Sequence, residues 1–532
     1  MSRRSLCLLI VCLSAAPILA EAPVGPDGAA LTLDGLRQAL EDYGYESAEA
    51  YYVGDAYGEE IVVGPINERY EWLLDPALAE WVAGLRDAAA DPAVARALGY
   101  LAWDLEAGLL WEPLEDYYIA ILEAEARGVI GFEGEEIAYR DVWEAIDELE
   151  DDERRDALRD AARAFVREEL QPRRAAYLEA LRAGCRELGY ADYVDYFARN
   201  RGRDFAQLAA DCLFILGQTR ELYITLAEER VAAVYPGRER LSLTSLERWR
   251  LWDDDEFDAY FGAAELVPAW EAFIGGLEVG YDELDNITLD DEDRPAKEPR
   301  AACWPMRVPE DVRVLVKPTG GFEDYQTLFH EMGHACHFAY TDPALPYELR
   351  ELGDDAITEA YAFLFENLFE NPLYLEEELE IPADEARELR RRQLFGELSG
   401  LRYYCMAFLY ELALHGVEAD HTATYKELVD MTSIWSHEPE DYLTGVFETN
   451  EDFYTTNYLY AWMLEAQLRR RLEEDFGPAW WREPAAGARL VDLWRRGYVP
   501  TPASLSAELG YEECSPRELV ELLAAQERAT RP

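Results

Sequence analysis

Apolar residues recur at intervals of three and four positions, over a charged background, through most of residues 33–285. Residues 152–189 show the pattern most clearly. Such spacing lines up apolar side chains on one face of an α-helix. Alternation typical of strands is scarce and is clearest at 59–64 and at 312–316, where a Pro-Thr-Gly-Gly turn follows. The pattern predicts a mainly α-helical fold with a minor β element.

A change of composition divides the chain near residue 290. Residues 284–300 are dense in Asp, Glu and Pro, which is typical of a connection between packed units. A chain of 532 residues is too long for one small core, so one large domain or two closely packed subdomains are expected. We predict a helical N-terminal subdomain at 21–290 and a second subdomain at 291–532 that carries the chemistry.

The first twenty residues have the pattern of a signal peptide. Arg3 and Arg4 precede the apolar run 6–13, and small residues lead to Ala20 as the last residue before cleavage. The apolar run is too short to span a bilayer, and no later stretch is apolar enough to do so. We therefore expect a signal peptide at 1–20 and an exported, periplasmic or secreted protein that is soluble in its mature form.

The charge balance excludes two classes of partner. Lys and Arg number 49 against 109 Asp and Glu, which gives a formal net charge of −60. Nucleic acids and anionic membranes would be repelled by such a chain, so neither is expected as a partner.

The cysteines give no sign of a thiolate metal site. Beyond the signal peptide they are Cys185, Cys212, Cys303, Cys336, Cys405 and Cys514. They are widely scattered and form no C-x-x-C pair, which disfavours a zinc site built from thiolates. Disulfides and buried free thiols both remain open.

The residues that indicate chemistry begin after Gly320-Gly321, where 322–338 is predicted to form a helix. His330 and His334 are four residues apart, so they lie one turn apart on the same face and can bind one metal ion. Glu331 is next to them and can hold a water without becoming a ligand. His337 is a possible fourth ligand, but a catalytic zinc keeps one position open, so a supporting role on the helix is expected instead.

A third ligand is expected in the nearly apolar helix predicted at 354–365. Glu359 lies in the middle of this helix, where a buried carboxylate is costly unless a positive charge accompanies it. Coordination of Zn²⁺ would remove that cost. Glu366, Asp355 and Glu351 remain as alternatives for the third ligand.

These residues resemble two families of zinc peptidases. His330-Glu331-x-x-His334 followed 25 residues later by Glu359 is similar to the thimet oligopeptidase and oligoendopeptidase family. The stretch from Cys303-Trp304 to the second histidine also resembles the angiotensin-converting enzyme family. The resemblance is strong at about 300–370 and moderate at 447–475, and elsewhere it is limited to helical character. It implies a two-lobed all-helical fold with a deep central channel that admits only short unfolded peptides.

In both families a tyrosine hydroxyl from a late helix assists the reaction. The segment 458–468 is similar to that helix, and Tyr458 takes the place of the tyrosine. Peptide hydrolysis also requires a hydrogen-bond donor of this kind, because water attack on a peptide carbonyl creates an oxyanion. Tyr460 and Tyr454 are the alternatives.

The chain departs from the converting enzymes at four places. Glu448 and Trp304 stand where histidines are found, Phe363 stands where an Asp follows the glutamate ligand, and Val446 stands where a lysine recognises the substrate's terminal carboxylate. The absence of that lysine favours internal cleavage over release of a C-terminal dipeptide, with a dipeptidyl carboxypeptidase as the alternative.

The sequence thus predicts a zinc metallopeptidase that acts on peptide substrates. One Zn²⁺ per chain is held by His330, His334 and Glu359, with Glu331 as general base and Tyr458 as oxyanion donor. We also expect the strand at 312–316 to dock the substrate backbone by strand addition. The alternatives are a non-catalytic zinc- or peptide-binding protein and a structural zinc protein in which His337 completes the coordination sphere.

Overall fold

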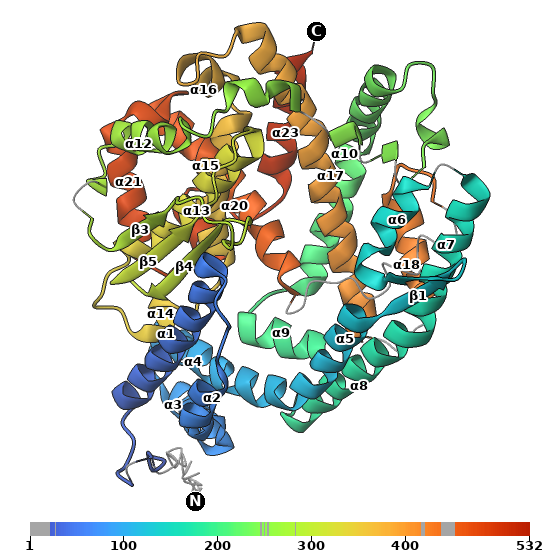
Figure 1. The fold of residues 1–532 in the computed structure, drawn as a ribbon. Coiled ribbons are helices and arrows are strands. Elements are labelled where there is room, and N and C mark those ends of the chain that lie inside the picture. Colours follow the sequence, from blue (N-terminus) through green and yellow to red (C-terminus); the bar gives the residue numbers. More distant parts are fainter. Residues whose placement is uncertain are drawn as a thin grey trace, which may run out of the picture.

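The computed structural model describes residues 22–26, 28–149, 151–244, 247–248, 250–252, 255–281, 284–416, 421–437 and 453–531. The predicted signal peptide at 1–20 and the positions of Val446 and Glu448 lie outside the described residues. These residues are mainly helical and form two small sheets, so the predicted fold class is confirmed (Figure 1). In the described part of the chain, none of the helices combines the length and the apolarity that a bilayer crossing requires.

Helices occupy most of the first half of the chain, as the periodicity predicts. They are α1 (Leu33–Tyr57), α2 (Gly64–Tyr70), α3 (Pro76–Ala88), α4 (Pro92–Trp111), α5 (Glu115–Arg127), α6 (Val142–Glu148), α7 (Asp152–Phe165), α8 (Gln171–Glu187), α9 (Tyr193–Arg201), α10 (Phe205–Val234) and α12 (Leu266–Gly276). Several begin at an aspartate whose carboxylate accepts a backbone N–H of the first turn, as Asp151 does from Arg154. The helical prediction for 152–189 is confirmed by α7, a π-turn at Val166–Leu170 and α8.

The second half is also helical. Its helices are α13 (Phe322–Tyr340), α14 (Tyr347–Arg350), α15 (Ala356–Glu366), α16 (Pro372–Glu377), α17 (Ala383–Gly416), α18 (His421–Thr432), α20 (Thr455–Phe476), α21 (Pro484–Trp494), α22 (Pro502–Glu508) and α23 (Arg517–Thr530). The helices predicted at 322–338, 354–365 and 458–468 are therefore confirmed as α13, α15 and α20.

The strands form a hairpin and a three-stranded sheet. The hairpin joins β1 (Val129–Phe132) to β2 (Glu135–Ala138), and the sheet has the order β3 (Ile287–Asp290), β5 (Asp311–Leu315), β4 (Ala302–Arg307). The strand predicted at 312–316 is confirmed as β5. The strand predicted at 59–64 is wrong, because residues 59–63 only connect α1 to α2 and Ile61 packs beside Gly54 of α1.

The position of β5 overturns the predicted strand addition. β5 is the central strand, parallel to β3 on one side and antiparallel to β4 on the other. Because both of its edges are paired, its backbone has no edge left for an added strand. A substrate backbone therefore cannot extend the sheet at 312–316, and the edges of this sheet belong to β3 and β4.

Two large hydrophobic cores lie on opposite sides of the molecule. One packs α12, α13, α15 and α21 with the three-stranded sheet, and the other packs α8, α9, α10 and α17. Figure 1 shows these groups on the two sides of the view. Each core combines residues from before and after position 290. The division into subdomains at 21–290 and 291–532, and the deep channel between lobes, remain predictions.

Candidate metal centre

The helix that carries the two histidines begins at a glycine turn. Gly320 and Gly321 have φ of 83° and 104°, which is the region that glycine adopts without strain. Asp324, in the first turn of α13, accepts hydrogen bonds from the backbone N–H groups of Thr319 and Gly320 at 2.6 and 2.7 Å. The turn therefore fixes where α13 begins, and with it the face on which His330 and the following turn lie.

Close packing of α15 on α13 brings the third ligand to the histidines. Gly333 lies at the contact, where a Cβ atom would meet Ala362 Cα at 2.6 Å and the Tyr361 carbonyl oxygen at 2.9 Å. Only a glycine lets the two backbones approach this closely. Glu359 lies in the buried stretch of α15 and faces the histidine pair.

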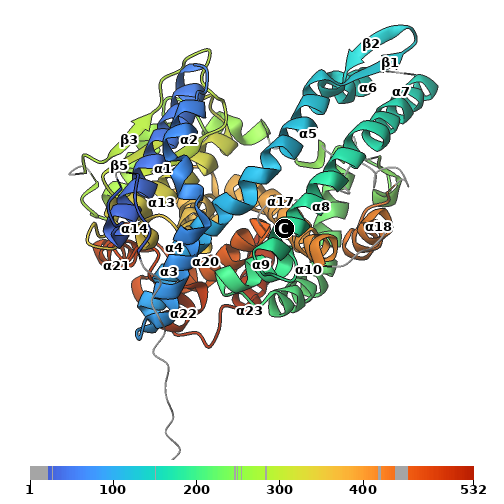
Figure 2. The same cartoon turned by 90° about the horizontal axis from the view of Figure 1, so that it is seen from below.

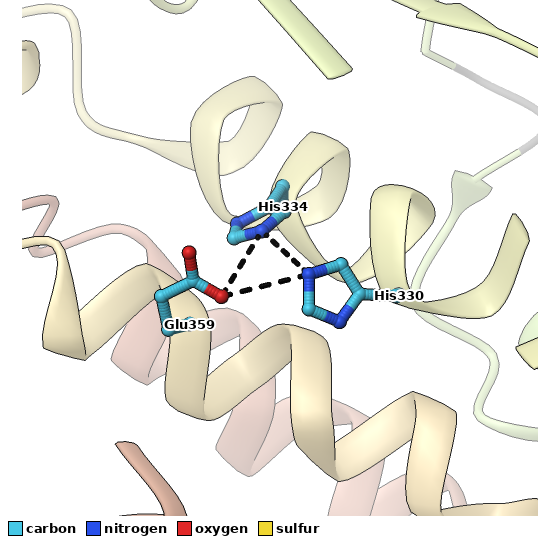
Figure 3. Close-up of side chains that lie close together, drawn as sticks. All are labelled: His330, His334 and Glu359. Atoms are coloured by element: carbon cyan, nitrogen blue, oxygen red, sulfur yellow. Dashed lines mark hydrogen bonds and ion pairs between the residues drawn. The ribbon is translucent and has the colours of Figure 1, made fainter. Parts of the chain in front are cut away.

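Three ligand atoms converge at this contact (Figure 3). The Nε2 atoms of His330 and His334 are 3.2 Å apart, and Glu359 Oε2 lies 3.5 and 3.6 Å from them. Glu359 is 2% exposed, and its Oε2 accepts no hydrogen bond from the described residues. An oxygen so deeply buried is costly without a partner. These three residues form a group that can hold a metal ion.

Each of the three residues is oriented by a hydrogen bond on its outer atom. His330 Nδ1 lies 2.8 Å from Glu366 Oε2, and His334 Nδ1 lies 2.8 Å from Thr358 Oγ1. The Tyr454 hydroxyl donates to Glu359 Oε1 at 2.6 Å. Hydrogen bonds of this kind fix the ring orientation and the tautomer of a metal-binding histidine.

The three alternatives for the third ligand form hydrogen bonds or ion pairs elsewhere. Glu366 supports His330 from outside the group, Asp355 pairs with Arg201 at 3.3 Å, and Glu351 Oε1 accepts from the Val308 N–H at 3.1 Å. None of them belongs to the group of converging ligand atoms found among the described residues.

Two further residues singled out by the sequence, His337 and Phe363, pack against aromatic side chains. His337 is buried beside Tyr361 and Tyr498 and is likewise outside the converging group. Phe363 stacks on Trp462 with ring centroids 5.2 Å apart. Phe363 cannot form a hydrogen bond through its side chain, and the outer hydrogen bonds of the three converging residues come from Glu366, Thr358 and Tyr454.

The protonation of the three groups is strongly coupled. Burial lowers the pKa of His330, but the hydrogen bond to Glu366 and the neighbouring carboxylates raise it overall to about 9. Burial, with the charge on His330, holds the pKa of His334 well below its usual range. Burial raises the pKa of Glu359 to about 7. At most one of the two histidines therefore carries a positive charge. A divalent cation would coordinate both imidazoles and the Glu359 carboxylate at once.

Glu331 lies beside the group but is not part of it. Its Oε2 accepts the backbone N–H of Cys303, in β4, at 2.6 Å. Burial raises the pKa of Glu331, against the opposing effects of His330 and of this hydrogen bond. The carboxylate is therefore held by β4 in the same cavity as the metal-binding group.

The three candidate tyrosines have different surroundings. Tyr458 lines the same cavity, with its ring 5.9 Å from Phe363. Tyr454 also lines it, but its hydroxyl is bonded to Glu359. Tyr460 packs instead against Arg203, 5.2 Å from its ring centre. The geometry therefore favours Tyr458 as the hydroxyl that can serve a bound molecule, and burial raises its pKa so that the hydroxyl stays protonated.

The cavity at the group has a volume of about 480 Å³. Its walls come from α1, β4, α13, α15 and α20 and from the chain segment before β4. It brings together the predicted site residues His330, Glu331, His334, Glu359 and Tyr458. The comparison of this chain with protein-family models finds no match, and the comparison with curated proteins finds none either.

Proposed function

We propose that this protein is a zinc metallopeptidase that hydrolyses peptide bonds in short unfolded peptides. The observation that carries the proposal is the spacing of 3.2–3.6 Å between the three converging ligand atoms. Ligands about 2.0–2.1 Å from a tetrahedral zinc lie about 3.4 Å from one another, so the set fits this ion without rearrangement. Two imidazoles and one carboxylate are also a ligand set found in catalytic zinc sites, with a fourth position left for water or substrate.

Zinc in this position would polarise the scissile carbonyl and lower the pKa of a nearby water toward neutrality. Glu331 accepts the proton of the attacking water and passes it to the leaving amine. The Cys303 N–H holds the carboxylate in place for both transfers. Burial makes Glu331 a stronger base than an exposed glutamate, because it disfavours the charged form.

Tyr458 donates its hydroxyl to the oxyanion that forms as the carbonyl is attacked. The hydrogen bond from this hydroxyl strengthens as negative charge develops on the carbonyl oxygen in the transition state. It therefore lowers the barrier to the reaction and does not only tighten substrate binding. The role falls to Tyr458 because the Tyr454 hydroxyl already orients Glu359. Glu366 and Thr358 keep the two histidines in the tautomer that presents Nε2 to the ion.

The resemblance to the thimet oligopeptidase and oligoendopeptidase family supports the same activity and implies that folded proteins are excluded as substrates. Internal cleavage follows from the absence of the lysine at position 446. Export through the signal peptide at 1–20 would put the enzyme among extracytoplasmic peptides. The excess of acidic residues agrees with peptides rather than nucleic acids or anionic membranes as partners.

The test is hydrolysis of a mixed peptide library by the purified protein, followed by mass spectrometry. Activity should be abolished by a chelator such as 1,10-phenanthroline and restored by adding zinc back. Metal analysis should find one zinc per chain. Zinc bound at this stoichiometry without any cleavage would indicate a non-catalytic zinc protein, and cleavage that survives complete removal of the metal would exclude the proposed mechanism.

A further inference from the structure

A second cavity lies far from the metal-binding group. Its volume is about 200 Å³, and it shares no lining residue with the cavity at His330. Figure 2 shows two of its walls, α5 and α8, running side by side, and both views place them away from α13. The other walls include Tyr193 of α9 and His415 of α17.

The lining is apolar and aromatic apart from one ion pair and one histidine. Arg174 and Glu125 are joined at 2.8 Å, so the charges in the wall compensate each other. Tyr118 and Leu122 line the cavity, and each is 44% exposed, so they form the rim of its opening to solvent. An apolar cavity with an open mouth and balanced charge favours an uncharged, largely apolar occupant.

His415 is the polar group that gives the cavity specificity. Its side chain is 7% exposed and is held between aromatic rings, 4.7 Å from Tyr193 and 5.5 Å from Phe453. Neither ring nitrogen forms a hydrogen bond with the described residues. Nδ1 is sealed from solvent, so Nε2 is the nitrogen that a bound group can reach. Burial lowers the pKa of His415 to about 3, so the imidazole is neutral at physiological pH. A buried neutral imidazole without a partner is costly, and a bound group can remove that cost.

We infer that this cavity is a second ligand site, which binds one aromatic ring that carries a hydroxyl group. The size is suitable, since an apolar cavity of roughly 150 Å³ already accepts benzene. The aromatic walls provide edge and face contacts for a planar ring. A hydroxyl both donates and accepts, so it satisfies the His415 imidazole in either tautomer. The source is either a free phenol or the tyrosine side chain of a peptide.

Binding of p-cresol, with toluene as the matched probe without a hydroxyl, tests the inference by ligand-observed NMR on the full-length protein. The expected result is that p-cresol binds about 3- to 10-fold more tightly than toluene, which corresponds to one added hydrogen bond. His415→Phe keeps the ring and its stacking but removes the nitrogens, so the preference for p-cresol should disappear. His437→Phe, which alters a histidine of another cavity, is the control and should leave the preference unchanged.

Leu122→Trp provides a second test of the binding site that does not depend on His415. Because Leu122 is partly exposed, the larger side chain can be accommodated without disturbing the core, and it should close the mouth and weaken both probes. Equal affinity of the two probes for the wild-type protein, or a preference that survives His415→Phe, would overturn the inference. The same holds if neither probe binds.

The peptides Gly-Tyr-Gly and Gly-Phe-Gly distinguish the two sources of the ring. Displacement of p-cresol by the tyrosine peptide, and not by the phenylalanine peptide, would assign the site to a peptide side chain. Binding of p-cresol without displacement by either peptide would assign it to a free phenol. The two peptides are added to the zinc-free protein, which by the proposed mechanism cannot cleave them, so the outcome is independent of the proposed peptidase activity.

Discussion

Two of the clusters of buried carboxylates in the described residues have different kinds of partner. In the first, Arg390 and Arg469 form ion pairs at 2.7–3.5 Å with Glu370, Glu397 and Glu465. In the second, Glu359 lies against two histidines, and no arginine or lysine in the described part of the chain forms an ion pair with it. In the first cluster each carboxylate pairs with an arginine, whereas the second lacks a permanent cation.

Burial alone does not distinguish the two clusters. It raises the pKa of Glu465 to about 7, as it does that of Glu359. The difference lies in the partner, because an arginine is always charged, whereas the charge of an imidazole depends on pH. The pKa of His330 is raised to about 9, but that of His334 lies well below its usual range. A buried glutamate therefore indicates a metal site only where the chain places histidines, rather than arginine, against it. We expect substitutions to separate the two clusters clearly.

The largest effect is expected for Glu359→Gln. The amide keeps the volume of the side chain but removes the charged ligand, so zinc content should fall from one per chain to near zero and peptide hydrolysis should be lost. Glu366→Gln, which alters only the outer bond to His330, should weaken zinc binding by about 10- to 100-fold. Metal analysis after dialysis measures both. Full zinc retention in Glu359→Gln would contradict the ligand assignment.

Glu331→Gln separates metal binding from catalysis within the second cluster. Zinc content and folding should be retained, while kcat falls by about 10²–10⁴-fold because an amide cannot accept the proton of water. Steady-state kinetics on one cleaved peptide measures the change. If more than about a tenth of the activity remains, a loss of only ~1.4 kcal/mol, Glu331 is not the base.

Arg469→Met tests the cluster that is paired with arginines. It leaves Glu465 and Glu370 without their shared cation, and loss of one partner from a buried ion pair costs about 3–5 kcal/mol of folding free energy. The denaturation midpoint should fall, with zinc stoichiometry unchanged in the folded fraction. Arg471→Met is the matched control, since Arg471 pairs with Asp475 on the exposed side of the same helix and should contribute at most about 1 kcal/mol.

Tyr458→Phe tests the proposed oxyanion donor on α20. Removal of one hydroxyl should leave zinc content unchanged and lower kcat by about 10²–10³-fold. Tyr460→Phe, two residues further along the same helix, should have no such effect because Tyr460 packs on Arg203 away from the cavity. The reverse outcome would place the oxyanion donor at Tyr460.

The smallest effect is expected from amidation of the substrate's C-terminus. Internal cleavage requires no recognition of a terminal carboxylate, so the rate and the cleavage position for a ten-residue peptide should stay nearly unchanged. Mass spectrometry of digests of the free and the amidated peptide makes the comparison. An obligatory free carboxylate with dipeptides as the first products would show that the enzyme is an exopeptidase.

The helices that carry the site were predictable because their patterns are local. The period of three to four residues identified the segments that became α13, α15 and α20, and the i, i+4 spacing of His330 and His334 placed them on one face. Strands were harder to predict. Ile61 and its neighbours resemble a strand in their composition, but no strand in the described part of the chain pairs with them and they connect two helices instead.

By itself, the sequence determined the helical class and the residues able to bind a metal, because periodicity and ligand type are properties of short segments. Only the tertiary structure decided how those residues are held. Gly333 allows α15 close enough for Glu359 to reach the histidines, and Glu366, Thr358 and Tyr454 orient the ligands. The order of the sheet places β5 in the centre, where it cannot accept another strand. Such contacts join segments distant in the chain, and no local pattern encodes which of them will meet.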